Sequence, residues 1–438
     1  MDPKQEIGWK YIERIRDLLY CIFLFFMPFT QALTFNVGFP LKFSELALFV
    51  LSFLYIFFNK RVVMPKPLFF VLSLLFIVVT TSLLVNLFWN YPYQLREYQT
   101  RFSYTGDSIA RYVYFILALL SFFVSLDIFL QNRRRYIKVW IWGALVAAGY
   151  SFYLSSFSFL GLNVILLPGM TDVQVAPILG RNIIRCGTFL EGNMMGLYLV
   201  LSAILCFYIK WFKAGVFLLL SVFTTISTLS IVAVFLFIVI YFKQSLFKRK
   251  YVAIALPTLA ILTLGIYLFS QTEVYEKYVY KKIFANTSKI SDPMAFSKAD
   301  RLFNIEDAYR MGWGNPVWGV GLSNYARHYD RYSNTTGYEP GFIKQMLRPG
   351  SKVIPNNIYL ELWSESGGTT LIIFLVLFCI LLYYSRHDAT NTLFAALLCM
   401  LLCFVAYPSF IMIYLWAFMA LPVADHILRI TNVQSNKS

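Results

Sequence analysis

The segment "RNIIRCGTFLEGN", residues 181–193, places Arg181 and Arg185 directly before a long apolar run. A guanidinium group stays protonated and donates paired hydrogen bonds to phosphate oxygens. If the segment is helical, side chains four residues apart share a face, and two arginines there would match a diphosphate. Two simpler interpretations stay open. The side chains reach the headgroups of a membrane, or Glu191 neutralises one of them in an ion pair.

A second pair of arginines lies in "SKADRLFNIEDAYRMGWGNPVWGVGLSNY", residues 297–325. Nine residues separate Arg301 from Arg310, which is roughly 180° around a helix. We therefore expect that both cannot point into one pocket if the helix is continuous. Apolar residues at helical spacing predict a short amphipathic helix that ends at Gly312; they are Leu302, Ile305, Tyr309 and Trp313.

The elements that must position these residues are membrane helices. Of 438 residues, 59% are hydrophobic and 14% charged, with mean hydropathy +0.63. Soluble domains carry about 25% charged residues, and runs of about 20 apolar residues predict transmembrane helices. We predict an all-α, polytopic membrane protein with about 12 spans and one large periplasmic loop. The predicted spans are residues 17–35, 43–59, 67–88, 108–130, 138–160, 193–209, 214–227, 229–242, 252–270, 366–384, 392–406 and 409–428.

Short basic loops mark the cytoplasmic side. "NKRVVMPK" at 59–66, "QNRRRYIK" at 131–138 and "KQSLFKRK" at 243–250 fall on the same side as both termini. This predicts three regions: residues 1–270 with spans one to nine and a short periplasmic segment at 161–192, a large periplasmic loop at 271–365, and residues 366–438 with the last three spans and a cytoplasmic C-terminus. We expect no removable signal peptide.

The large loop is basic. Its cations are either a solvated surface or a site for an anionic ligand at the outer membrane surface; they are Lys277, Lys281, Lys282, Lys289, Lys298, Arg301, Arg310, Arg327, Arg331, Lys344, Arg348 and Lys352. The three histidines and six cysteines show no spacing for a metal site. Glycine-rich phosphate loops are absent. We therefore expect no metal, no cofactor and no nucleic-acid partner.

Three segments in a characteristic order resemble the superfamily of Wzy-type O-antigen polymerases and O-antigen ligases of bacterial inner membranes. The first is Arg185, "GTF" and Asn193 before a helix. The second, in the large loop, contains Arg301, Ala308, Pro316, Gly319, Gly321 and Tyr325. The third is "NNIYLELWSESGG", residues 356–368, where the chain re-enters the membrane. Two departures accompany the resemblance: ligases carry a histidine where this chain has Asn356, and an arginine-containing element of many relatives reads "TISTLSI" here.

The resemblance implies a glycosyltransferase with GT-C-like architecture in the bacterial inner membrane, acting at its periplasmic face. The donor would be an oligosaccharide linked to undecaprenyl diphosphate, with a chain-length regulator and a flippase as possible partners. The histidine departure favours a polymerase, which transfers the growing chain onto a new lipid-linked repeat unit. Alternatives are a ligase that transfers glycan to lipid A core, a cell-wall glycan polymerase, and a lipid-linked oligosaccharide flippase, which makes no bond.

On this interpretation cations hold the departing diphosphate and a carboxylate assists the acceptor hydroxyl. The predicted catalytic residues are Arg185, Arg301, Glu191 and Glu365. The predicted substrate-binding residues are Arg181, Arg310, Asn193, Tyr325, His328, Asn356 and Asn357. The sequence leaves the base open among Glu191, Glu306, Asp307, Glu361 and Glu365.

Overall fold

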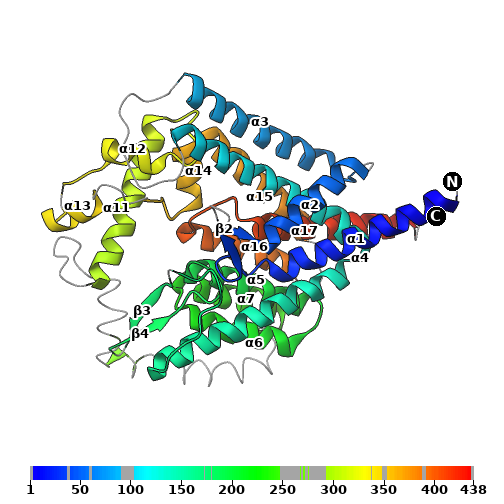
Figure 1. Cartoon of the computed structure of the whole chain (residues 1–438), viewed down its shortest axis with the longest axis horizontal. Helices are drawn as coiled ribbons and strands as arrows, with labels where there is room; N and C mark the ends of the chain where they lie inside the picture. The colour runs from blue at the N-terminus through cyan, green and yellow to red at the C-terminus, as the bar shows by residue number, and fades with distance from the viewer. Residues whose placement is uncertain are drawn as a thin grey trace.

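A computed structural model describes residues 3–36, 40–58, 62–89, 103–171, 173–178, 180–246, 293–336, 338–347, 353–386 and 391–435, together with residues 267, 270, 271 and 275. The described chain is all-α apart from two short antiparallel hairpins, as the sequence predicted (Figure 1). Its first half contains α1 (Pro3–Phe26), β1 (Thr34–Asn36), β2 (Pro40–Lys42), α2 (Phe43–Phe58), α3 (Lys66–Phe88), α4 (Tyr104–Leu160), β3 (Val175–Ile178), β4 (Arg181–Ile184), α5 (Gly192–Tyr208), α6 (Phe212–Val222), η1 (Phe223–Thr225) and α7 (Thr228–Leu246).

The second half begins with four helices of the large loop and ends with three helices of the bundle. They are α11 (Pro293–Gly314), α12 (Tyr325–Tyr332), α13 (Pro340–Met346), α14 (Ile358–Ser366), α15 (Gly368–Ser385), α16 (Thr392–Cys403) with η3 (Phe404–Ala406), and α17 (Ile413–Ser435). In Figure 1 the loop helices gather at the end of the bundle opposite both termini.

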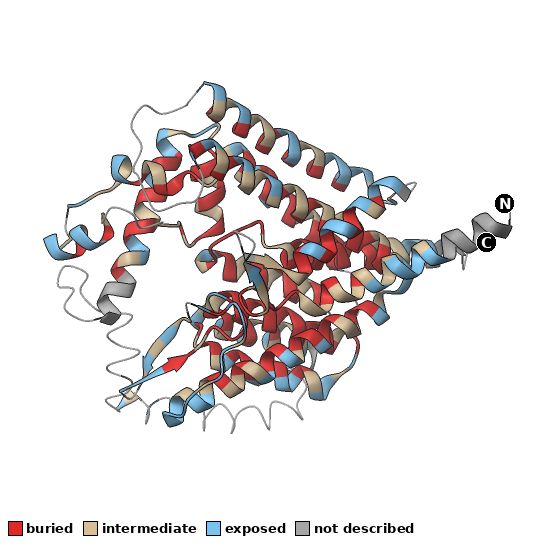
Figure 2. Ribbon diagram, viewed as in Figure 1, coloured by how far each residue is buried: buried red, intermediate tan, exposed pale blue. Residues whose placement is uncertain are grey.

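Four described helices are long and apolar enough to cross a membrane: Lys66–Phe88, Tyr104–Leu160, Gly368–Ser385 and Ile413–Thr431. Five shorter apolar helices accompany them. Every predicted span with described residues contains a helix; the predicted span at 252–270 lies almost entirely outside those residues. Buried residues fill the centre of the bundle, whereas the outer face of α3 is exposed (Figure 2).

Three predicted boundaries were wrong. The first helix ends at Phe26 instead of residue 35, because Pro28 cannot continue a helix. The last helix begins at Ile413 instead of 409. The spans at 108–130 and 138–160 form one element, α4, which breaks at a single residue, Asn132 (φ −153°, ψ 67°). The Asn132 side chain accepts a hydrogen bond from the Arg135 backbone at 3.3 Å and so caps the second half of α4.

The polar segment "TTISTLS" joins two helices, as predicted. After η1, Ile226 adopts a left-handed conformation (φ 50°), and α7 begins two residues later. The Ser227 hydroxyl accepts a hydrogen bond from the Ser230 backbone at 3.4 Å. Ser and Thr compete with the helix for backbone partners, so this stretch ends one helix and starts the next. The break leaves the carbonyl of Ile226 without a helical partner.

The large loop folds around its own apolar core, which contains Phe303, Ala308 and Met311 of α11 together with Tyr325 and Tyr329 of α12. The predicted amphipathic helix exists and extends to Gly314 instead of Gly312. Leu302, Tyr309 and Trp313 are exposed, because α12 and α13 pack on the opposite side of α11. Helical spacing identifies an apolar stripe without saying which face the partner will cover.

Buried polar contacts attach the loop to the bundle. The carboxylate of Glu361 in α14 accepts hydrogen bonds from Arg111 of α4 and, at 2.9 Å, from the Phe410 backbone. The hydroxyl of Ser82 in α3 donates to the Trp318 carbonyl at 2.6 Å. These contacts hold the loop at the C-terminal end of α3 and the N-terminal end of α4.

Candidate active site

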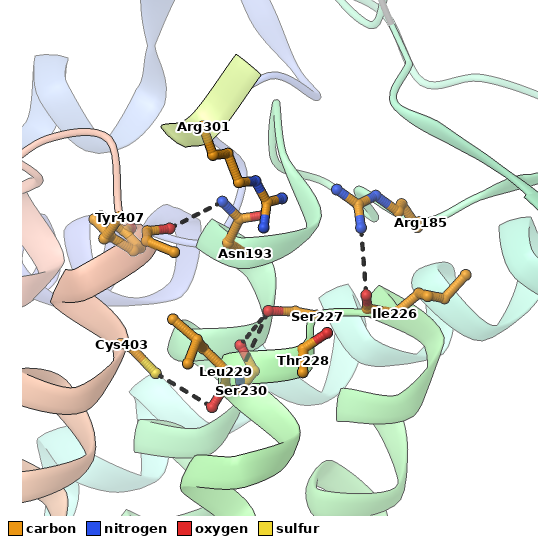
Figure 3. Close-up of a pocket in the computed structure, with 11 residues that line it drawn as sticks. Arg185, Asn193, Ile226, Ser227, Thr228, Leu229, Ser230, Arg301, Cys403 and Tyr407 are labelled. Carbon is orange, nitrogen blue, oxygen red and sulfur yellow. Dashed lines mark hydrogen bonds between the residues drawn. The ribbon is translucent and has the colours of Figure 1, made fainter. Parts of the chain in front are cut away.

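A pocket lies where the bundle meets the large loop. It holds about 470 Å³ of empty space, part of it open to solvent. Among the described residues that line it, Arg185 and Arg301 are the only charged ones (Figure 3). The other lining residues are Asn193, Ile226, Ser227, Thr228, Leu229, Ser230, Cys403, Ala406 and Tyr407.

Hydrogen bonds from its backbone and from its guanidinium group hold Arg185 in place. It follows β4, and its backbone N–H donates to the Gln174 carbonyl at 3.1 Å. Its Nε donates to Oε1 of Gln174 at 3.1 Å, and its Nη1 donates to the carbonyl of Ile226 at 3.3 Å. The same Gln174 oxygen accepts from the Gly192 backbone at 2.8 Å. The guanidinium therefore has a defined direction, with its remaining N–H groups available to a ligand.

The local structure corrects the predicted pairing of Arg181 with Arg185. Residues 181–184 form a strand, not a helix, so the two side chains are not one helical turn apart. Arg181 is exposed on β4, and its Nη1 would lie 2.2 Å from a Cβ built on Gly161. It therefore lies against the turn that ends α4, outside the residues that line the pocket.

Two glycines allow α5 to approach the broken helix. A Cβ at Gly192 would lie 2.6 Å from the carbonyl oxygen of Thr225, and a Cβ at Gly196 would lie 2.3 Å from the Ser230 hydroxyl. Such contacts are too short for any larger residue unless the backbone moves. This close packing brings the Ile226 carbonyl within reach of Arg185.

Arg301 enters the pocket from α11 and faces Arg185 across it (Figure 3). Burial lowers the pKa of Arg185, and the positive charge of Arg301 lowers it further. Within the described part of the chain, no carboxylate forms an ion pair with either guanidinium under 4 Å. Two guanidinium groups that converge without a paired carboxylate have the donor geometry and the charge to bind a multiply charged anion.

Glu191 and Asn193 lie beside the two arginines at the start of α5. Nδ2 of Asn193 donates to Oε2 of Glu191 at 3.2 Å and to the Ala406 carbonyl at 3.1 Å. Burial raises the pKa of Glu191, while the charges of Arg185 and Arg301 lower it. Three of the predicted residues thus line the pocket, namely Arg185, Arg301 and Asn193, and Glu191 lies next to them without lining it.

Arg310 lies elsewhere, as expected from its position on α11. It is exposed and forms an ion pair with Glu306 at 2.9 Å. Glu365 is buried in α14, where its carboxylate accepts from the backbone of Ser323 at 2.9 Å and of Tyr325 at 3.4 Å. It holds the turn before α12 and does not line the pocket.

The remaining predicted residues support the loop. The buried Tyr325 donates to the Asn304 carbonyl at 2.9 Å. Asn357 caps α14 by accepting from the Leu360 backbone at 3.1 Å, and Asn356 precedes it with φ 52°. His328 is half-buried in α12, and burial lowers its pKa to about 4. None of these residues is among those that line the pocket.

Several lining residues were not predicted from the sequence. The segment Ile226–Ser230, where the predicted spans 214–227 and 229–242 meet, forms one wall of the pocket. Cys403 is the last residue of α16, and Tyr407 directly follows η3. Gln174 was also missed. Only the polar interruption of an apolar run at 224–230 was a signal visible in the sequence.

Part of the chain matches a known protein family. Residues 213–375 match a family model described as O-antigen ligase, which confirms the resemblance drawn from the three segments. The matched region contains α7, α11 and α14, hence Ile226–Ser230 and Arg301, whereas Arg185, Asn193 and Tyr407 lie outside it. No curated protein matches the chain. The match and the apolar helices together indicate a membrane protein related to enzymes of O-antigen assembly.

Proposed function

We propose that this protein is an O-antigen or polysaccharide repeat-unit polymerase with twelve spans in the bacterial inner membrane. It transfers the growing glycan from undecaprenyl diphosphate onto a new lipid-linked repeat unit at the periplasmic face. The observation that carries the proposal is the convergence of Arg185 and Arg301 in one pocket. A lipid diphosphate is the anion that such a pair would bind at a membrane surface.

In the proposed reaction, an acceptor hydroxyl attacks the anomeric carbon of the donor sugar. The bond between that carbon and the diphosphate oxygen breaks, and the electron pair leaves with the diphosphate. Negative charge grows on this leaving group, and donors already oriented toward it stabilise the transition state more than the ground state. Gln174 and Ile226 orient Arg185 before the substrate arrives.

Glu191 is the base in this proposal, and it accepts the proton of the acceptor hydroxyl. It is preferred over Glu361 and Glu365, whose carboxylates are occupied by Arg111 and by backbone N–H groups. Asn193, which lines the pocket, donates to the Glu191 carboxylate and holds it beside the pocket. The raised pKa of Glu191 makes it a stronger base than an exposed carboxylate.

A ligase that transfers glycan to lipid A core is the second candidate, because the matching family model is described as O-antigen ligase. The chemistry at the donor is the same, and only the acceptor differs. Deletion in cells separates the two. Loss of a polymerase leaves single repeat units on the core, whereas loss of a ligase leaves none.

The experiment compares arginine variants of purified protein acting on a lipid-linked repeat unit. Arg185→Ala and Arg301→Ala are each expected to lower the rate by about 10²-fold, because a charged hydrogen bond contributes about 1.5–3 kcal/mol. Arg185→Lys keeps the charge but loses the forked geometry, and should fail nearly as badly.

Arg310→Ala and Arg181→Ala are the matched controls, since both side chains lie outside the pocket. They should retain most of the activity at equal protein levels in the membrane. A normal rate for Arg185→Ala would contradict the proposed function. If neither the unaltered protein nor any variant elongates the glycan, but the unaltered protein still transports the lipid-linked repeat unit across the membrane, the result would favour a flippase.

A further inference from the structure

The apolar stretch that contains the second half of α4 is longer than a membrane span requires. Residues 139–171 contain no Asp, Glu, Lys or Arg, whereas about 20 residues cross a bilayer. The helix ends at Leu160, where Gly161 adopts φ 75°. The apolar sequence "LGLNVILL", residues 160–167, therefore continues beyond the helix.

The chain turns back along α4 after Gly161. The hydroxyl of Tyr153 accepts a hydrogen bond from the Ile165 backbone at 2.8 Å. The hydroxyl of Tyr150 donates to the Ile165 carbonyl at 3.0 Å and accepts from the Leu167 backbone at 3.0 Å. Tyr150 lies ten residues before the end of α4, about 15 Å along the helix axis. The loop therefore descends toward the level of the last turns of a membrane helix.

The outer side of this loop is apolar and exposed. Relative exposure is 60% for Leu160, 51% for Leu162 and 77% for Ile165. Water would not favour such a surface, but the two tyrosines satisfy backbone groups that a lipid environment would leave unpaired. Arg181 lies against the Gly161 turn at the rim of the loop, where a cation would meet lipid phosphates.

We propose that residues 160–167 are a re-entrant loop embedded in the outer leaflet of the lipid bilayer. Arg181 lies at its rim, at the level of the lipid phosphates. The same segment leads through Gln174 into the hairpin that carries Arg185, so the embedded loop holds the arginine pocket at the membrane surface. This inference rests on the chain spanning a membrane and does not depend on the reaction.

Spin labels in the full-length protein, reconstituted in vesicles of phosphatidylcholine and phosphatidylglycerol, test the proposal. Cys379 is the one exposed cysteine of the six, so Cys379→Ser gives the background, which should take up no label. Leu162→Cys and Ile165→Cys are the test positions. Phe49→Cys on the exposed face of α2 is the lipid reference, and Thr335→Cys in the exposed part of the large loop is the aqueous reference.

Collisions of each label with oxygen, which concentrates in lipid, are compared with collisions with a water-soluble nickel chelate. The ratio at positions 162 and 165 should exceed that at 335 several-fold and approach that at 49. A ratio equal to that at 335 would overturn the proposal. Protection from both reagents would place the loop against protein and would overturn it as well. Neither outcome depends on whether the protein transfers glycan.

Discussion

At the scale of single residues, the direction of Arg185 depends on Gln174. Replacing Gln174 by Ala leaves the Arg185 Nε and the Gly192 N–H without their acceptor, and unpaired buried donors cost about 1–3 kcal/mol. Glycan transfer by Gln174→Ala should fall about 10-fold or more. Gln174→Glu keeps the acceptor but adds a negative charge beside Arg185, so it should raise KM for the anionic donor more than it lowers kcat. Identical kinetics for the two variants would argue against a positioning role.

The pH dependence tests Glu191 at the same scale. A base must be ionised, and burial raises the pKa of Glu191, so the rate should begin to fall at a higher pH than for an exposed carboxylate. The positive charge of Arg301 lowers this pKa. Arg301→Gln should therefore raise the pKa of Glu191 further. On acidification, the residual activity of this variant should begin to fall at a higher pH than the activity of the unaltered protein. A pH profile that is the same in Glu191→Gln and the unaltered protein would exclude this base.

At the scale of elements, the close contact between α5 and the segment at 225–230 is required for the pocket. A Cβ at Gly192 meets the backbone carbonyl of Thr225, which cannot rotate away. Gly192→Ala should therefore lower both the thermal unfolding temperature in detergent and the activity. Gly149→Ala is the matched control, because its Cβ would meet no atom within 4 Å. Equal unfolding temperatures for the two variants would mean that α5 tolerates the added methyl group.

The element α11 carries a buried carboxylate whose titration should be visible in stability. Burial raises the pKa of Asp307 from 3.8 to about 7. Its contribution to stability is thus present below its ordinary pKa and is lost as the pH rises through about 7. Asp307→Asn keeps hydrogen-bonding atoms toward Ser333 and Asn334 without the charge. It should unfold at a higher temperature than the unaltered protein at about pH 8, and the difference should shrink as the pH is lowered below about 7 and vanish only below the ordinary pKa of 3.8.

At the scale of the whole molecule, the orientation in the membrane decides whether the pocket meets a periplasmic substrate. A cysteine at exposed Val63 lies in a basic short loop, and one at exposed Thr335 lies in the large loop. In intact cells an impermeant thiol reagent should label Thr335→Cys and not Val63→Cys. Permeabilised cells should label both. The reverse pattern in intact cells would invert the topology and remove the proposed site from the periplasm.

Much of the architecture follows from local sequence patterns. Apolar runs of roughly the length of a bilayer crossing predict where helices lie, because hydrocarbon satisfies no backbone group. The break at "TTISTLS" follows in the same way from its hydroxyl side chains. The nine-residue spacing of Arg301 and Arg310 already implied that only one of them reaches a given pocket, and Arg301 is the one that does.

Other features depend on contacts between distant segments. Arg181 and Arg185 look like a pair in the sequence, but they lie at opposite ends of β4, at the turn and at the base of the hairpin. In the sequence, Glu191 and Glu365 are equivalent candidates for the base. In the structure, the carboxylate of Glu365 already accepts hydrogen bonds from the backbone N–H groups of Ser323 and Tyr325. Ile226 and Tyr407 reach the pocket only through packing, and Gln174 reaches Arg185 in the same way. Charge and hydropathy are local properties that sequence alone determined, whereas the direction of a side chain and its partner were decided by the tertiary structure, because both depend on which remote elements pack around it.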